Sequence, residues 1–169
     1  MMRAVGGWLR RRAEDLAAAM LAVMFAAFIV QIVFRYFLNF PVGWTSELTI
    51  IMWLWLVLWG AAFVVKEREE IRFDLLSGAV GRRARIAMGL VAASALVILY
   101  AASLPATWDY VTFMKVERSS YLKIRLDWLY SIYLIFLAAI LVRYLWILTQ
   151  LLRGKDPDEA APTQPSSGL

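Results

Sequence analysis

Four stretches of the 169-residue sequence are long, apolar and almost free of formal charge. Three of them, at 16–34, 48–65 and 86–108, contain no charged residue, and the fourth, at 128–152, contains only Arg143. A hydrocarbon core about 30 Å thick is crossed by ~20 helical residues, at ~1.5 Å per residue. The sequence therefore predicts an all-α integral membrane protein with four transmembrane helices, at about 16–38, 46–65, 86–108 and 127–150.

The positions of the basic residues predict the orientation of these helices. Two short connections lie on one side of the predicted bundle, and both termini lie on the other side with the long connection. The terminal side carries twelve basic residues: Arg3, Arg10, Arg11, Arg12, Lys66, Arg68, Arg72, Arg82, Arg83, Arg85, Arg153 and Lys155. The opposite side carries four: Lys115, Arg118, Lys123 and Arg125. Since positive loops remain inside, both termini are predicted to be cytoplasmic.

The polar segments outside the predicted helices differ from one another in composition. Trp8 and Leu9 among the N-terminal arginines favour an interfacial amphipathic segment, and so do the apolar residues of the 66–85 connection. For the connection, a solvated loop that packs on the bundle is the alternative. The tail, 153–169, contains three prolines and little hydrophobicity, which is typical of a disordered segment. The membrane domain is therefore predicted at 1–152.

Several classes of chemistry have no suitable residues. The chain contains no histidine and no cysteine, so the usual ligands of membrane haem and zinc and a thiolate nucleophile are all missing. No predicted span contains a cluster of carboxylates or a broken centre where a substrate or ion would bind. The net charge of +5 follows from membrane topology and does not indicate nucleic-acid binding. We predict no enzymatic activity, no metal and no cofactor.

The stretch from Val33 to Leu48, VFRYFLNFPVGWTSEL, joins the first two spans. Its Asn, Pro and Gly residues break the helix, and Thr45 or Ser46 is predicted to cap the next one. Arg35 either extends to lipid headgroups or pairs with Glu47, and Glu47 either complements the helix dipole or serves in docking.

Other residues in the first two spans indicate helix packing. Ala18, Ala22 and Ala26 repeat every four residues and form a small-residue face that permits close helix approach. Gln31 is predicted to form a hydrogen bond between helices. The tryptophans at positions 53, 55 and 59 are too deep for an interfacial belt alone and indicate a broad packing surface.

These motifs resemble the small membrane subunit (Q subunit, DctQ-like) of tripartite ATP-independent periplasmic (TRAP) transporters. The resemblance covers roughly 15–150 and is specific only as far as Asp74. The chain departs from the family pattern at Glu70, where the family often has histidine, and early in the last span. The matching positions, which are the candidate structural and partner-interface residues, are Arg35, Tyr36, Pro41, Trp44, Glu47, Trp53, Gly60, Ala61, Lys66, Ile71 and Asp74.

The resemblance implies an accessory scaffold subunit in the inner membrane of a bacterial cell. Its stable partner would be the large TRAP membrane subunit, which carries the substrate and sodium sites for organic acid uptake. A periplasmic substrate-binding protein would dock transiently, and Trp44 and Glu47 would face it. From the residues alone, two other functions stay open, namely a membrane anchor of a redox enzyme and a small oligomeric channel.

Overall fold

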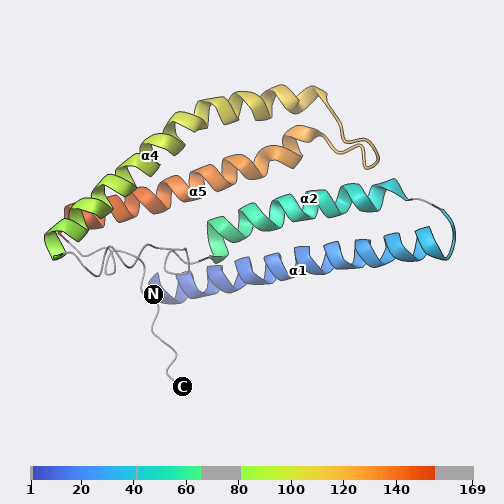
Figure 1. Ribbon diagram of the computed structural model, residues 1–169, viewed down its shortest axis with the longest axis horizontal. Coiled ribbons are helices and arrows are strands. Elements are labelled where there is room, and N and C mark those ends of the chain that lie inside the picture. The colour runs from blue at the N-terminus through green and yellow to red at the C-terminus, as the bar shows by residue number, and fades with distance from the viewer. Residues whose placement is uncertain (1, 41, 66–80, 155–169) are drawn as a thin grey trace, which may run out of the picture. The chain divides into compact units, whose positions relative to one another are not determined.

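The computed structural model describes residues 2–40, 42–65 and 81–154, with side chains from Gly7 onward. Its main helices are α1 (Met2–Tyr36), α2 (Gly43–Trp59), α4 (Arg82–Phe113) and α5 (Leu126–Leu152), as Figure 1 shows. Two short helices continue α2 and α4: a π-helical turn, η1 (Gly60–Val64), and a 3₁₀ turn, η3 (Met114–Val116). Four helices in the described part are long and apolar enough to cross a membrane, which is the number that the sequence predicts.

The first helix is longer than predicted, because the basic N-terminal segment is part of it. Side chains on successive turns support this extension. The Nε atom of Arg10 lies 2.8 Å from the Glu14 carboxylate, and Arg12 lies 3.7 Å from Asp15. The guanidinium of Arg12 also lies 5.5 Å from the ring centre of Trp8. The N-terminal segment predicted to be interfacial is therefore continuous with the first span.

The chain divides into two compact units. The first unit comprises Met1–Val65 and Pro105–Phe136, and the second comprises Lys66–Leu104 and Leu137–Leu169. One boundary between them falls inside α4 at Pro105. Proline has no amide hydrogen and interrupts the hydrogen-bond ladder of a helix, so this boundary coincides with a weak point in the backbone of α4.

In the first unit, α1 and α2 run antiparallel and side by side (Figure 1). The buried side chains of α1 are Ala13, Met20 and Ala27, which repeat every seven residues. Such a repeat keeps one narrow stripe of a helix against its partner. From α2 and η1, Ile51 and Ala62 are also buried.

The small-residue face predicted on α1 is not the face that packs on α2. Ala18, Ala22 and Ala26 are exposed, and α1 packs with a different stripe. Each helical residue advances the helix by about 100°, so Ala22 lies nearly opposite Met20. The α1–α2 pair uses a stripe that alternates a bulkier Met with two alanines, while the all-alanine stripe lies free on the other side.

The start of α2 also differs from the prediction. The helix begins at Gly43, its N-cap is Val42, and no side chain caps it. Thr45 does not act as an acceptor for backbone amides, because its hydroxyl donates to the Val42 carbonyl at 2.8 Å. Thr45 is completely buried, so this bond satisfies a hydroxyl that has no access to water.

The second unit contains a small core of Ala93, Ile147 and Leu151, with Leu90, Tyr144 and Leu148 packed against it. Arg82, at the start of α4, donates to the carbonyl of Gly154 at 3.2 Å and so ties α4 to the end of α5. Of the predicted surface segment at 66–85, residues 82–85 belong to α4 and residues 66–80 lie outside the described residues. Most of the predicted disordered tail, 155–169, lies outside them as well.

Candidate functional site at the turn end of the first unit

The turn end of the first unit is where α1 turns into α2 and where α4 turns into α5. Glu47, in the second turn of α2, joins the end of the α1–α2 turn to the α4–α5 turn by hydrogen bonds. Its carboxylate accepts hydrogen bonds from the backbone amides of Tyr121 at 2.6 Å and Leu122 at 3.3 Å. The Ser119 side chain is a third hydrogen-bond partner of this carboxylate. Glu47 thus satisfies polar groups at the tip of the α4–α5 turn, 74 residues away in sequence.

The α4–α5 turn is itself a short hairpin. Arg118 and Arg125 face each other as an antiparallel bridge. The backbone amide of Ser119 donates to Ile124 at 2.9 Å, and the amide of Leu126 donates to Glu117 at 3.1 Å. At the tip, Lys123 has a φ of 55°, in the left-handed region. The hairpin therefore bonds its own base and leaves two tip amides for Glu47.

The hairpin also approaches the backbone of α2 closely. The ring of Tyr121 lies against Gly43, and a methyl group at position 43 would overlap the carbon atoms of this ring. Glycine is therefore required here for its lack of a side chain. The contact places the ring of Tyr121 beside the first residue of α2 and its backbone amide beside Glu47.

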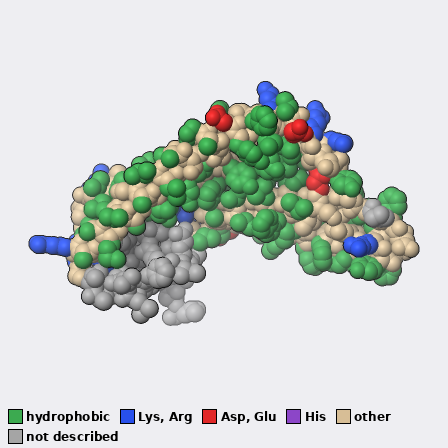
Figure 2. All heavy atoms as spheres, turned by 45° about the horizontal axis from the view of Figure 1, so that its top comes forward, with side chains coloured by type: hydrophobic (Ala, Val, Ile, Leu, Met, Phe, Trp, Pro, Cys, Tyr) green, Lys and Arg blue, Asp and Glu red, His purple; other side chains and the backbone are tan. Residues whose placement is uncertain are grey.

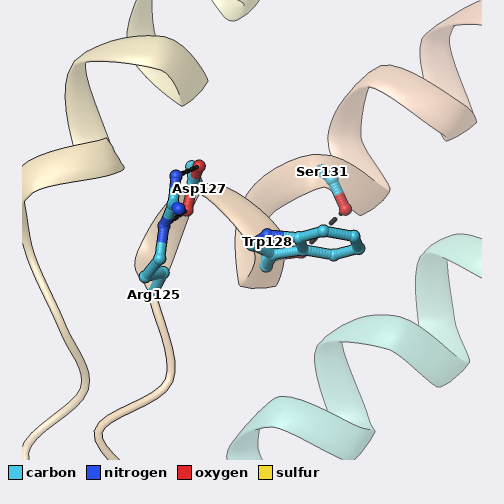
Figure 3. A network of polar contacts seen from close by, with 4 residues as sticks. All are labelled: Arg125, Asp127, Trp128 and Ser131. Atoms are coloured by element: carbon cyan, nitrogen blue, oxygen red, sulfur yellow. Dashed lines mark hydrogen bonds and ion pairs between the residues drawn. The ribbon is translucent and has the colours of Figure 1, made fainter.

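A second polar group lies at the base of the hairpin, where α5 begins (Figure 3). Arg125 makes a two-point contact with Asp127, with Nε 3.1 Å from Oδ1 and Nη2 2.7 Å from Oδ2. Paired geometry of this kind is the strongest form of Arg–carboxylate contact. One turn later, Ser131 donates to the Trp128 carbonyl at 2.7 Å. The ion pair fixes Arg125 at the start of α5.

Polar side chains within the spans of this unit join helices to one another. Gln31 donates to the hydroxyl of Ser46 at 2.9 Å, which confirms the predicted hydrogen bond between helices. The indole of Trp55 donates to the Leu129 carbonyl at 3.0 Å. The indole of Trp59 donates to the Ala13 carbonyl at 3.1 Å. These three bonds attach α2 to α1 and to the start of α5.

The predicted interface residues fall into different environments. Glu47 is bonded to the hairpin, and the structure has no ion pair between it and Arg35, whose side chain is exposed. Tyr36 and Trp44 are exposed on either side of the first turn. Trp53 is 55% exposed, unlike Trp55 and Trp59, which are half-buried. Gly60 is half-buried at the start of the π-helical turn, and a methyl group added there would meet no side chain within 4 Å. Pro41, Lys66, Ile71 and Asp74 lie outside the described residues.

Sequence reasoning missed the residues that meet Glu47, namely Ser119 and Tyr121. The segment at 117–126 contains serines and basic residues that suit any exposed turn. No local pattern links it to a position 74 residues earlier. The glycine at position 43 is the one available signal, because a glycine at the first position of a helix hints at a close neighbour.

Among the described residues, no group of three or more His, Cys, Asp or Glu side chains is placed to hold a metal ion. The carboxylates of Glu47 and Asp127 are both engaged by donors of the same chain. Three tyrosines lie nearby, with ring centres of Tyr110 and Tyr130 5.7 Å apart and those of Tyr130 and Tyr133 5.9 Å apart.

Comparison with known proteins identifies similar chains. Residues 24–154 match the family described as tripartite ATP-independent periplasmic transporters, DctQ component. The C4-dicarboxylate TRAP transporter small permease protein DctQ of Vibrio cholerae serotype O1 is 31% identical over 108 residues. That alignment covers 64% of this chain and 47% of the relative, so the match spans about half the length of the Vibrio protein.

Proposed function

This chain belongs to the DctQ component family of tripartite ATP-independent periplasmic transporters, and from that membership we propose that it is the scaffold subunit of such a transporter. It holds a larger membrane subunit in place and takes no part in the chemistry of transport. Both termini lie in the cytoplasm of a bacterium, and the turn end of the first unit faces the periplasm. The membership favours this function over a redox anchor or a channel.

The observation that carries the proposal is the free alanine stripe of α1. Ala18, Ala22 and Ala26 are exposed, on the side of α1 opposite the stripe that packs on α2. In a bilayer, stripes of small residues allow another helix to approach closely enough for extensive van der Waals contact. A lipid chain against the same stripe makes no comparable van der Waals contact. A helix of a partner protein is therefore the occupant that we propose.

The exposed face of α2 supports the same proposal. Ile50, Trp53 and Val57 are exposed at helical spacing, and the open Gly60 follows them one turn later. A bulky residue beside a small one gives an uneven surface, and the side chains of a second protein can pack into its depressions. Figure 2 shows how much of the visible face is apolar.

The substrate and the remaining partner follow from the family and from its relative. We propose that the assembled transporter takes up organic acids, with C4-dicarboxylates as the first class to test, in a sodium-coupled reaction. A soluble periplasmic binding protein delivers the acid and touches the turn end of this chain transiently. The exposed cations Lys115, Arg118 and Lys123 of the hairpin suit an acidic surface on that protein.

The first experiment is co-purification of the tagged chain with the large subunit from mild detergent. Ala22→Trp fills the alanine stripe and should reduce recovery of the large subunit at least tenfold. Ala101→Trp on α4 is the matched control, because Ala101 is also exposed within a span. It should leave recovery unchanged.

Two results would count against the scaffold proposal. One is full recovery of the partner with Ala22→Trp, which would mean that the stripe faces lipid. The other is substrate uptake by vesicles that contain this chain without any other subunit. Uptake by the chain alone would move the transport pathway into α1, α2, α4 and α5.

A further inference from the structure

The first turn of the chain forms an apolar tip. We define the apolar tip as five residues of the α1–α2 turn, all with exposed side chains: Tyr36, Phe37, Leu38, Phe40 and Trp44. Phe37 is 82% exposed and Leu38 is 59% exposed. No charged residue occurs between Arg35 and Glu47. Apolar side chains surround this end of the α1–α2 hairpin at the right of Figure 2. The α4–α5 turn, in contrast, carries several charged residues.

Two backbone amides of the turn donate hydrogen bonds to carbonyls of α1. The amide of Phe37 donates to the Val33 carbonyl at 2.9 Å, and the amide of Phe40 donates to the Phe34 carbonyl at 3.0 Å. Asn39 has a φ of 53°, a conformation that asparagine tolerates better than most residues. A turn that bonds two of its amides internally leaves fewer of them to be satisfied by water. It is suited to a medium with less water than the bulk solvent.

The tip stands beyond the start of α5 along the helices. The bond between the Trp55 indole and the Leu129 carbonyl fixes the relative level of α2 and α5. α2 begins at Gly43, twelve residues before Trp55, whereas α5 begins at Leu126, three residues before Leu129. The start of α2 therefore lies about 13 Å beyond the start of α5, at 1.5 Å per residue. An upright molecule with Arg125 and Asp127 at the membrane boundary would expose this apolar tip to water.

We propose that the apolar tip of the α1–α2 turn is a lipid-binding surface. It lies in the headgroup layer of the leaflet at the turn end. Its residue types indicate this medium, because Tyr and Trp are enriched in the interfacial layer and Arg35 can extend to lipid phosphates. The tip is also continuous with the exposed face of α1, where Phe25, Ile29 and Val33 follow one another at four-residue spacing. The helices of the first unit then cross the membrane at a tilt, which keeps Arg125 and Asp127 at the boundary while the apolar tip enters the headgroup layer.

The proposal goes beyond the scaffold function and does not depend on which side of the membrane holds the termini. Its test uses the absence of cysteine, because a single introduced cysteine carries the only label. The full chain with Leu38→Cys is labelled with a nitroxide and reconstituted alone into vesicles of phosphatidylethanolamine and phosphatidylglycerol at a high lipid-to-protein ratio. Lys123→Cys, at the tip of the charged hairpin, is the control.

Relaxation of the two nitroxides by oxygen and by a water-soluble nickel chelate measures their depth. We expect the ratio of oxygen to nickel accessibility to be at least fivefold higher at position 38 than at position 123. Equal ratios at the two positions would overturn the proposal. Phe40→Cys repeats the measurement at an independent position in case the label at 38 disturbs the turn.

Lipid, a second copy and a protein partner give different results. Protection of position 38 that does not change when the vesicles are diluted with lipid supports lipid as the occupant. Protection that disappears on dilution would show a second copy at the tip and overturn the proposal. Protection seen only when the large subunit is reconstituted with the chain would also overturn it, and would leave the scaffold function intact.

Discussion

The carboxylate of Glu47 accepts a hydrogen bond from the backbone amide of Tyr121 at 2.6 Å, and the ring of the same tyrosine lies on Gly43. One residue of the α4–α5 hairpin thus contacts α2 twice, one helical turn apart. The two contacts differ in kind, since the first is a charged acceptor on backbone donors and the second is steric fit. They can therefore be tested separately by changing Glu47 and Gly43.

Replacing Glu47 with Gln should loosen the tip of the α4–α5 hairpin. The amide side chain keeps one acceptor oxygen but loses the negative charge, and its NH₂ group would face the donor that remains. We expect hydrogen exchange at the amides of Tyr121 and Leu122 to become several-fold faster. Glu117→Gln is the control, because the Glu117 side chain is exposed. An unchanged exchange rate in the Glu47 variant would show that the Glu47 carboxylate does not protect these two amides from water.

Replacing Gly43 with Ala should destabilise the first unit by about 1–3 kcal/mol, which is the usual range for an added methyl group in a packed site. The sign is informative, because alanine is intrinsically the better helix residue and would stabilise an unobstructed helix. Thermal unfolding in detergent measures the effect. In a Tyr121→Ala background the same change should become neutral or slightly stabilising. Destabilisation of equal size in both backgrounds would exclude the tyrosine ring as its cause.

The hydrogen bond between Gln31 and Ser46 should contribute about 0.6 kcal/mol, as similar bonds between membrane helices do. Gln31→Leu and Ser46→Ala should each lower the free energy of unfolding. The double variant should be no worse than the more damaging single variant, because both remove the same bond. Strict additivity of the two effects would contradict the contact.

The tryptophans of α2 should differ in their response to phenylalanine. Trp55→Phe removes the donor to Leu129 and leaves a carbonyl with one partner fewer, which should cost about 1 kcal/mol. Trp53→Phe removes no such bond, and its effect on unfolding should be smaller. Trp59→Phe should resemble Trp55→Phe, because its indole donates to Ala13. The three variants differ only in position, so each serves as a control for the others.

The sequence allowed the fold class to be predicted because the membrane imposes a minimum length on each helix. Four apolar runs of that length, three of them without any charge, leave little choice, and the bond from Gln31 followed from its depth in a span. The ends of the helices were predicted less well. The helix start near Met2 depends on pairs such as Arg10–Glu14, which stabilise a polar helix beyond the apolar run.

The face of α1 that packs on α2 could not be predicted from composition. Both the Ala18 stripe and the Met20 stripe are regular, and either permits a close helix pair. The choice depends on how Ile51 and Ala62 fit against each, which is a property of both helices together. Contacts across many residues, such as Glu47 with Tyr121, were beyond prediction for the same reason. The energy of such a contact depends on where the loop lies in space. The packing of the spans determines that position, and no local sequence pattern encodes it.

The π-helical turn at Gly60–Val64 has a consequence for how this chain tolerates change in length. The amide of Val65 bonds to the carbonyl of Gly60 at 2.8 Å, so the turn holds one residue more than an α-helical turn. Removing a single residue there would restore a regular helix without breaking α2, and it would rotate the helical residues after the deletion by about 100° about the axis of α2. A one-residue deletion in this turn would therefore change the direction in which the chain leaves the helix at Val65 in a single genetic step, while Gly43–Trp59 keep their helical register.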